Sequence, residues 1–187
     1  MVLALAATPG VTGCKRASHA RVSSYVPPPA PAGFVERSGS GWRLSVPTTW
    51  HDGTSSGGRA WTVVDPQVTE GLHAKVFVVT EPFAGESYDY AKASQAGLKS
   101  TPRTSVATAR EEVIDGDTTL VLESTFAPVA GAADASDARA PSAIKAMQTA
   151  LASRGTGYVV SCSVAAGAFE TYRSTCESIV RSFAVER

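Results

Sequence analysis

The chain has 187 residues, a hydrophobic fraction of 43%, and 17 basic side chains against 17 acidic ones. A chain of this length supports one domain with a substantial core, since it buries about two-thirds of its unfolded surface. The balanced charge gives no reason to expect nucleic-acid binding, and no stretch reaches the about 20 apolar residues that cross a bilayer as a helix.

The first 13 residues are typical of a secretory signal. An apolar stretch opens the chain, Pro9 and Gly10 break it, and small residues lead up to Cys14. The four residues "VTGC" resemble the bacterial lipobox, whose cysteine is diacylated on sulfur and becomes the new N-terminus. The resemblance implies a signal peptide over residues 1–13 and lipidation of Cys14. Because no Lys or Arg precedes the apolar stretch, we expect this signal to be truncated at its start.

The other interpretation of Cys14 is a buried structural cysteine near the terminus, and its position favours lipidation. Two or three acyl chains hold a protein at a membrane effectively permanently, at about 0.8 kcal/mol for each buried methylene. We therefore expect the protein in the cell envelope, anchored to the membrane by lipid. Residue 15 is Lys and not the Asp that retains enteric lipoproteins at the inner membrane, which favours the outer membrane, facing the periplasm, in a host with two membranes.

Residues 14–33 are predicted to be a tether between the anchor and the folded part. The basic cluster of Lys15, Arg16, His19 and Arg21 would lie beside the lipid head groups, where each charge adds about 1 kcal/mol of attraction if the lipids are anionic. The segment "SSYVPPPAPAG" favours extended polyproline II structure. A PxxP ligand is the alternative, but its usual partners are cytoplasmic.

The folded domain is predicted to span residues 34–187, and it opens with strands. In "GWRLSV", Trp42, Leu44 and Val46 alternate on one face, which indicates a half-buried strand that ends at Pro47. "AWTVVD" and "HAKVFVVT" predict two further strands, separated by the turn-forming "PQVTEG".

A helix and a hairpin are predicted next. "SYDYAKASQAGLKS" favours a helix with Ser87 as its N-cap and Asp89 in its first turn. "TSVATAREEVI" and "TTLVLESTF" are typical of two strands, joined by a tight turn at Gly116. Residues 127–142 are small and polar without a period, so we expect an exposed loop.

The last third of the chain contains one ambiguous segment. Residues 144–152 combine helical spacing with strong helix formers, yet "SRGTG" and the clear strand "YVVSCSV" behind them are typical of a hairpin. The closing segment predicts an amphipathic helix that packs on a sheet. Its apolar face consists of Phe169, Tyr172, Cys176, Ile179, Val180 and Phe183.

This order of elements resembles the PsbP-like fold, an α/β/α sandwich that also occurs in DcrB-type bacterial lipoproteins. The residues that carry the resemblance are Trp42, Pro47, Trp50, Gly116, Tyr158, Ser182 and Phe183. It implies an α+β protein with an antiparallel sheet and helices packed on its faces. It also implies a strand over 144–152, because bacterial members usually pair the last two strands. All of these are packing or turn residues, so they predict the fold and not the function.

We find no catalytic or metal motif. His19 lies in the tether, His51 follows Trp50 in a polar loop, and His73 starts a strand. None of them has HExxH spacing, or a Cys or second His at the spacing of metal ligands. The serine-rich loop around Gly53 lacks the order of a phosphate-binding loop, and "DGD" lacks the later ligands of an EF-hand. We therefore expect no enzymatic activity, no cofactor and no metal ion.

The function that fits these features is a non-enzymatic binding or accessory module for a protein or small ligand of the envelope. We expect a monomer that does not bind nucleic acid. One alternative is an envelope hydrolase, which would need a pocket where His51 or His73 meets a serine and a carboxylate. Another is an adaptor of a secretion system, because some effector chaperones resemble this fold; they work in the cytoplasm, against which Cys14 argues.

With Cys14 committed to lipid, Cys162 and Cys176 remain as one pair in an oxidising compartment. Cys162 lies on the apolar face of the last long strand and Cys176 on the apolar face of the following helix. If that helix folds back on the sheet, the two Cα atoms come within the about 4.4 to 6.8 Å that a disulfide needs. We therefore predict a Cys162–Cys176 disulfide; the alternative is two reduced, buried cysteines.

Overall fold

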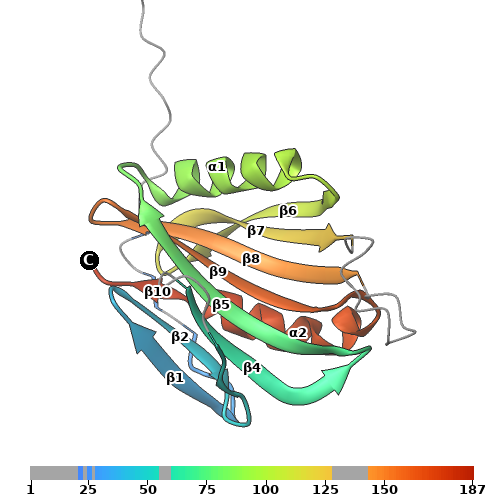
Figure 1. Cartoon of the computed structure of the whole chain (residues 1–187). Coiled ribbons are helices and arrows are strands. Elements are labelled where there is room, and N and C mark those ends of the chain that lie inside the picture. The colour runs from blue at the N-terminus through green and yellow to red at the C-terminus, as the bar shows by residue number, and fades with distance from the viewer. Residues whose placement is uncertain (1–20, 23–24, 27, 55–59, 128–142) are drawn as a thin grey trace, which may run out of the picture.

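The computed structural model describes residues 21–22, 25–26, 28–54, 60–127 and 143–187 (Figure 1). Cys14, Lys15, Arg16 and His19 lie outside the described residues, as does almost all of the predicted loop over 127–142. Within the described part, no helix is both long and apolar enough to cross a membrane.

A seven-stranded antiparallel sheet forms the centre of the domain (Figure 1). Its spatial order is β3-β4-β5-β9-β8-β7-β6. The strands are β3 (His51–Asp52), β4 (Ala60–Thr69), β5 (Leu72–Pro82), β6 (Thr104–Ile114), β7 (Asp117–Phe126), β8 (Ile144–Ser153) and β9 (Thr156–Ala165).

Three hairpins of this sheet turn through two residues with positive φ. At the β6–β7 turn, Asp115 and Gly116 have φ of 50° and 81°, and Glu70–Gly71 and Arg154–Gly155 repeat the pattern. Such turns match the twist of the flanking strands. Glycine at the second position adopts the positive φ without the steric strain that a Cβ atom would cause. The predicted hairpin at Gly116 is confirmed. The turn predicted over "PQVTEG" is shorter than expected, because β4 continues to Thr69.

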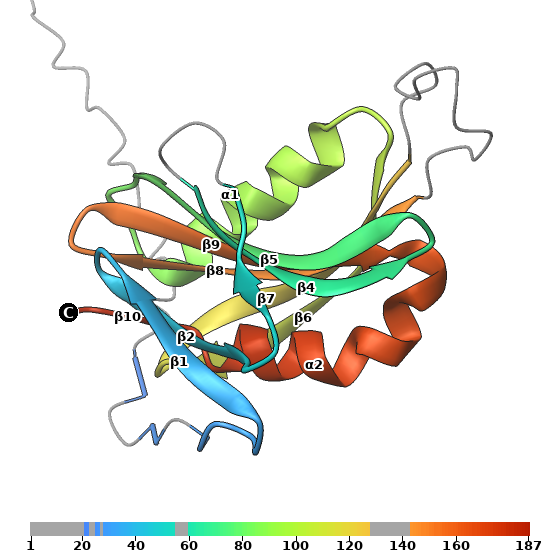
Figure 2. The same cartoon turned by 60° about the horizontal axis from the view of Figure 1, so that its bottom comes forward.

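Two helices cover opposite faces of the sheet (Figure 2). Helix α1 (Ser87–Ser100) packs on β6, β7 and β8, and helix α2 (Phe169–Arg181), which follows a 3-10 turn over Ala166–Ala168, packs on β8 and β9. This arrangement confirms the α+β class and the α/β/α order of layers.

A small second sheet lies beside α2 and was not predicted as a sheet. It consists of β1 (Phe34–Gly39), β2 (Trp42–Pro47) and β10 (Ala184–Val185). Of these three strands, only β2 has the alternating sequence that marks a half-buried strand; β1 has three exposed residues out of six, and β10 has only two residues. Both pair with β2, and all three strands contribute apolar side chains to the core, among them Phe34 and Val35 of β1 and Val185 of β10.

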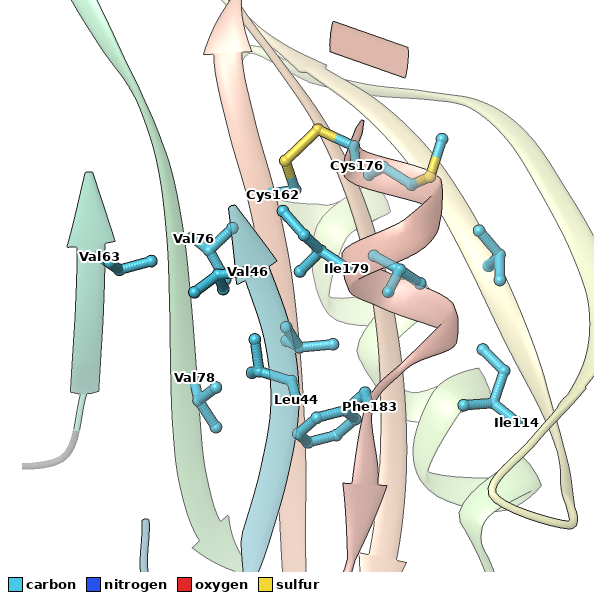
Figure 3. Close-up of a cluster of buried hydrophobic side chains, with 14 of the residues drawn as sticks. Leu44, Val46, Val63, Val76, Val78, Ile114, Cys162, Cys176, Ile179 and Phe183 are labelled. Atoms are coloured by element: carbon cyan, nitrogen blue, oxygen red, sulfur yellow. A yellow bond between two sulfur atoms is a disulfide. The ribbon is translucent and has the colours of Figure 1, made fainter. Parts of the chain in front are cut away.

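The main core fills the space between the large sheet, α2 and the small sheet (Figure 3). Leu44, Val46, Val76, Ile179 and Phe183 are almost completely buried there. A smaller cluster lies under α1, around Tyr90, Leu120 and Leu122. Each face of the sheet therefore has its own apolar contact, which fixes both helices on it.

The ambiguous segment is strand β8, as the resemblance to the PsbP-like fold predicted. It pairs along its length with β9 and over Ile144–Thr149 with β7. Because α1 covers one of its faces and α2 the other, its residues are buried on both sides. Tertiary pairing therefore outweighs the helix propensity of this segment.

Two local predictions were wrong. Glu86, not Ser87, is the N-cap of α1, and it makes no side-chain capping bond. Ser87 is buried, and its hydroxyl donates to the Asp117 carboxylate and accepts from the Ala152 backbone N–H at 2.9 Å. His51 does not lie in a loop: it belongs to β3, where it pairs with Val64 and is exposed.

The start of the described chain lies against the β6–β7 turn. The Val22 N–H donates to the Gly116 carbonyl at 2.7 Å, and the Arg21 guanidinium donates to the Asp115 carbonyl at 2.8 Å. At the other terminus, Arg187 pairs with the Asp115 carboxylate at 3.0 Å. Both ends of the described chain therefore contact the same turn.

Candidate functional site

A cleft of about 440 Å³ opens where β4, the first two strands and the start of α2 come together. We call it the Asp65 cleft. Aromatic and neutral polar side chains form most of its lining. The lining residues are Phe34, Pro47, Trp50, Asp65, Gln67, Thr69, Ala168, Thr171, Tyr172 and Thr175.

Asp65 enters the cleft because β4 is irregular at this point. The register between β4 and β5 shifts between Val64 and Val68, and Pro66 lies inside the shift. Proline lacks the N–H that a ladder needs, so it is accommodated at such irregularities. Two residues further on, the Gln67 N–H donates to Asp65 Oδ1 at 3.0 Å. Only 7% of the Asp65 surface is exposed.

Tyr172 on α2 reaches the other oxygen of this carboxylate. Its hydroxyl donates to Asp65 Oδ2 at 2.8 Å. Burial raises the pKa of the Tyr172 phenol, and its hydrogen bond to Asp65 raises the pKa further. The phenol therefore keeps its proton at physiological pH and holds the carboxylate in one orientation.

Trp50 forms a wall beside this pair. Its ring is buried, with its centroid 6.4 Å from that of Tyr172 and the planes tilted by 53°. Phe34 and Pro47, which pair across β1 and β2, add apolar surface from the small sheet. The cleft therefore combines aromatic walls with one carboxylate, a combination suited to binding a small ligand or a side chain of a partner.

A disulfide holds α2 in position next to the cleft. Cys162 on β9 and Cys176 on α2 are bonded, with Cα atoms 5.4 Å apart and no exposed surface (Figure 3). Tyr172 precedes Cys176 by four residues, so it lies about one helical turn away on the same side of α2. The covalent link therefore fixes the register at which Tyr172 reaches Asp65.

The two histidines of the described part do not line this cleft. His73 Nδ1 donates to the backbone carbonyl of Asp65 at 2.8 Å, so the imidazole contacts the main chain and the carboxylate faces Tyr172. His51 is exposed on β3. Among the described residues, neither histidine forms the contact with a serine and a carboxylate that a hydrolase would need.

A second cavity, of about 410 Å³, lies at the start of α1. Arg21, Arg154 and Arg187 line it together with Glu86 and Asp117. Arg187 pairs with Asp117 at 3.1 Å, so acidic neighbours already compensate part of this positive charge. No group of three or more His, Cys, Asp or Glu side chains within the described ranges is arranged to hold a metal ion.

The sequence did not reveal the Asp65 cleft. Asp65 and Tyr172 are 107 positions apart, and Tyr172 was assigned to the apolar face of its helix. The available signal was Pro66 within a valine-rich strand, which indicates a bulge and a polar side chain turned out of the ladder. The contact between Asp65 and Tyr172 depends on how α2 folds back on the sheet, which no local sequence pattern encodes.

No family model matches the chain, and no curated protein matches it. Solved structures with the same architecture include cyanobacterial PsbP (CyanoP) from Synechocystis sp. PCC 6803, with a TM-score of 0.55 and 15% identity over 83% of this chain and 94% of that one. LpqN of Mycobacterium tuberculosis, described as involved in cell envelope biogenesis, has a TM-score of 0.55 and 15% identity over 82% of this chain and 90% of LpqN. These similarities show that the domain has the PsbP-like fold.

Proposed function

We propose that this protein is a lipid-anchored, monomeric accessory protein of the cell envelope that binds a ligand in the Asp65 cleft without chemical turnover. The observation that carries the proposal is the cleft itself: aromatic walls and a buried carboxylate, supplied by segments that are distant in the sequence. Such a concave, mainly aromatic site with few polar groups is the usual form of a binding pocket.

The envelope location is supported by two further observations. The "VTGC" sequence that ends at Cys14 resembles a lipobox, and LpqN, which shares the fold, is described as involved in cell envelope biogenesis. A lipid anchor followed by a tether would hold the PsbP-like domain at the membrane surface.

Fractionation tests the anchor. The full chain, expressed in a bacterium behind a complete lipoprotein signal, is expected in the membrane pellet, and Cys14→Ser is expected in the soluble fraction. Ser18→Ala, a small change in the same segment that leaves the cysteine in place, serves as the control and should stay in the pellet. Equal retention of the Cys14→Ser variant in the pellet would contradict lipidation.

Affinity capture from envelope extract tests the binding function. Thr171 is an exposed residue on the rim of the cleft, so Thr171→Lys should obstruct it without disturbing the core. A component retained by the natural domain and lost with Thr171→Lys supports the proposal. Turnover of generic ester, peptide or phosphate substrates that disappears in His51→Ala or His73→Ala would overturn the non-enzymatic assignment.

A further inference from the structure

We propose that the ligand of the Asp65 cleft is an organic cation, a protonated amine carried on an apolar stem. This inference rests on the proposed role of the cleft as a binding site and adds the charge and shape of what it binds.

The first argument is the charge of Asp65. Its carboxylate is almost fully buried, and its partners are neutral donors, the Tyr172 hydroxyl and the Gln67 N–H. In the part of the chain that the structure describes, no Lys or Arg forms an ion pair with it. Buried carboxylates are normally paired with a cation, because desolvation of the charge is costly.

Glu123 is the matched comparison inside the same domain. It is buried to a similar degree, with 5% exposed, but Arg173 and Lys145 both pair with its carboxylate. Glu123 lies under α2, whereas Asp65 lines an open cleft. Of these two buried carboxylates, the one without a basic partner among the described residues is therefore the one that a ligand can reach.

The second argument is the surface around this carboxylate. Trp50 and Tyr172 present rings beside it, and aromatic faces attract cations within about 6 Å of the ring centre. The rim adds threonine hydroxyls and the Gln67 amide, and none of the described residues that line the cleft is basic. The described lining therefore offers a cation the carboxylate and the aromatic rings, with no basic side chain in that lining to repel it.

The third argument is size. A volume of about 440 Å³ lies within the roughly 300–1,000 Å³ of small-molecule pockets and far exceeds what a bare metal ion needs. Among the described residues, Asp65 is the only acidic one that lines the cleft, which is too few ligands for a metal site. An amine on a hydrocarbon or aromatic stem would use both the charge and the apolar walls.

Calorimetric titration of the full-length protein with three probes of one shape tests the inference: benzylammonium, benzyl alcohol and benzoate. We expect benzylammonium to bind at least tenfold more tightly than benzyl alcohol and benzoate not to bind. Asp65→Asn keeps an oxygen acceptor for the Gln67 N–H and should reduce benzylammonium affinity at least tenfold, to the level of the alcohol. Asp52→Asn removes an exposed carboxylate outside the cleft and should change nothing.

Thr171→Lys is the second variant, because it leaves the buried floor intact. It should abolish benzylammonium binding while the thermal midpoint of unfolding stays unchanged from that of the natural protein. Equal affinity for all three probes would overturn the charge assignment and leave the cleft as a binding site. Absence of any binding would overturn this inference, and capture of the same envelope component by natural and Thr171→Lys protein would overturn the proposed function.

The amine can belong to a free small molecule or to a lysine side chain. A peptide with a central lysine and the same peptide with that lysine acetylated separate the two sources. Tighter binding of the unmodified peptide than of benzylammonium identifies a protein ligand, and the reverse order identifies a small molecule. Equal affinity of the acetylated and unmodified peptides, together with equal affinity of the benzyl probes, contradicts the inference.

Discussion

Glu123 lies on β7 beneath α2, where Arg173 and Lys145 neutralise its carboxylate. Burial works to raise the pKa of Glu123, but the hydrogen bonds and charges of Arg173 and Lys145 outweigh it and hold the pKa below its usual 4.5. A carboxylate with a lowered pKa stabilises the fold above the pKa of the unfolded chain, and this contribution is lost as pH falls through the folded-state pKa.

We therefore expect Glu123→Gln to lower the free energy of unfolding by about 2 kcal/mol at pH 7, since hydrogen bonds to charged groups contribute about that much. The difference between the two proteins should shrink as the pH falls below 4.5, because Glu123 then takes up a proton and becomes neutral, as the glutamine is at every pH. Urea denaturation between pH 2 and 7 measures this. Glu36→Gln, which removes an exposed pair with Arg43 at 3.9 Å, is the control and should cost less than about 0.5 kcal/mol.

The Cys162–Cys176 disulfide is the second residue-scale feature with a measurable effect. It closes a loop with a sequence separation of 14, for which the chain-entropy model gives about 3 kcal/mol. The Cys162→Ala/Cys176→Ala variant should lose about this much unfolding free energy. Mass spectrometry of unreduced peptides should detect the linked pair in protein from the envelope, and free alkylatable thiols at both positions would contradict the assignment.

At the scale of elements, Ser87 fastens the start of α1 to two strands. Its hydroxyl lies between the Asp117 carboxylate on β7 and the Ala152 N–H on β8. This role replaces the N-cap that the sequence predicted, because Ser87 is already inside the first turn and faces the sheet. The helix start is therefore held by a tertiary contact and not by a local cap.

Ser87→Ala should cost about 1 to 3 kcal/mol, because the Ala152 N–H would be left buried without an acceptor. Ser100→Ala at the other end of α1 removes only an exposed bond to the Gly97 carbonyl at 2.9 Å and should cost little. Thermal unfolding followed by circular dichroism compares the two. Similar midpoints for both variants would show that Ser87 does not secure the helix.

Elements with a clear period were predictable from the sequence. The alternation in β2, the valine-rich β4 and β5 and the apolar face of α2 each report burial on one side of the element. Strand β8 was not decided by its own residues, since burial on both faces erases the period of two, and β1 and β10 depend on pairing with β2. The cleft was not predictable, because Asp65 and Tyr172 meet only after the whole domain has assembled.

For the whole molecule, the β6–β7 turn connects the two ends of the described chain. Asp115 accepts from Arg187 and from the Val185 N–H, and its carbonyl accepts from Arg21. The left-handed backbone at this position, with φ of 50°, suits Asp and Asn better than most residues. Asp115→Asn therefore removes the charge and keeps the turn.

We expect Asp115→Asn to speed amide hydrogen exchange at Val22 and Val185 up to about tenfold, which corresponds to the loss of about 1.4 kcal/mol in local stability. Exchange at Val160, in the middle of the sheet, should stay unchanged. Exchange measured by NMR at these three amides checks the prediction. Acceleration at Val160 as well would indicate global destabilisation and not local release of the ends.

Arg21 and Arg187 both bond to Asp115, so the two ends of the described chain lie close together. A short linker between these ends would cost little loop-closure entropy, so the chain order can be circularly permuted with new ends at the Arg154–Gly155 turn. That turn lies beside the C-terminus, where Ser153 bonds to the Glu186 carbonyl at 2.6 Å, and at the end of the sheet opposite the β4–β5 turn (Figure 1). A reporter fused there would leave the entrance of the Asp65 cleft open, so the permuted domain would serve as a ligand sensor if the cleft binds a ligand as proposed.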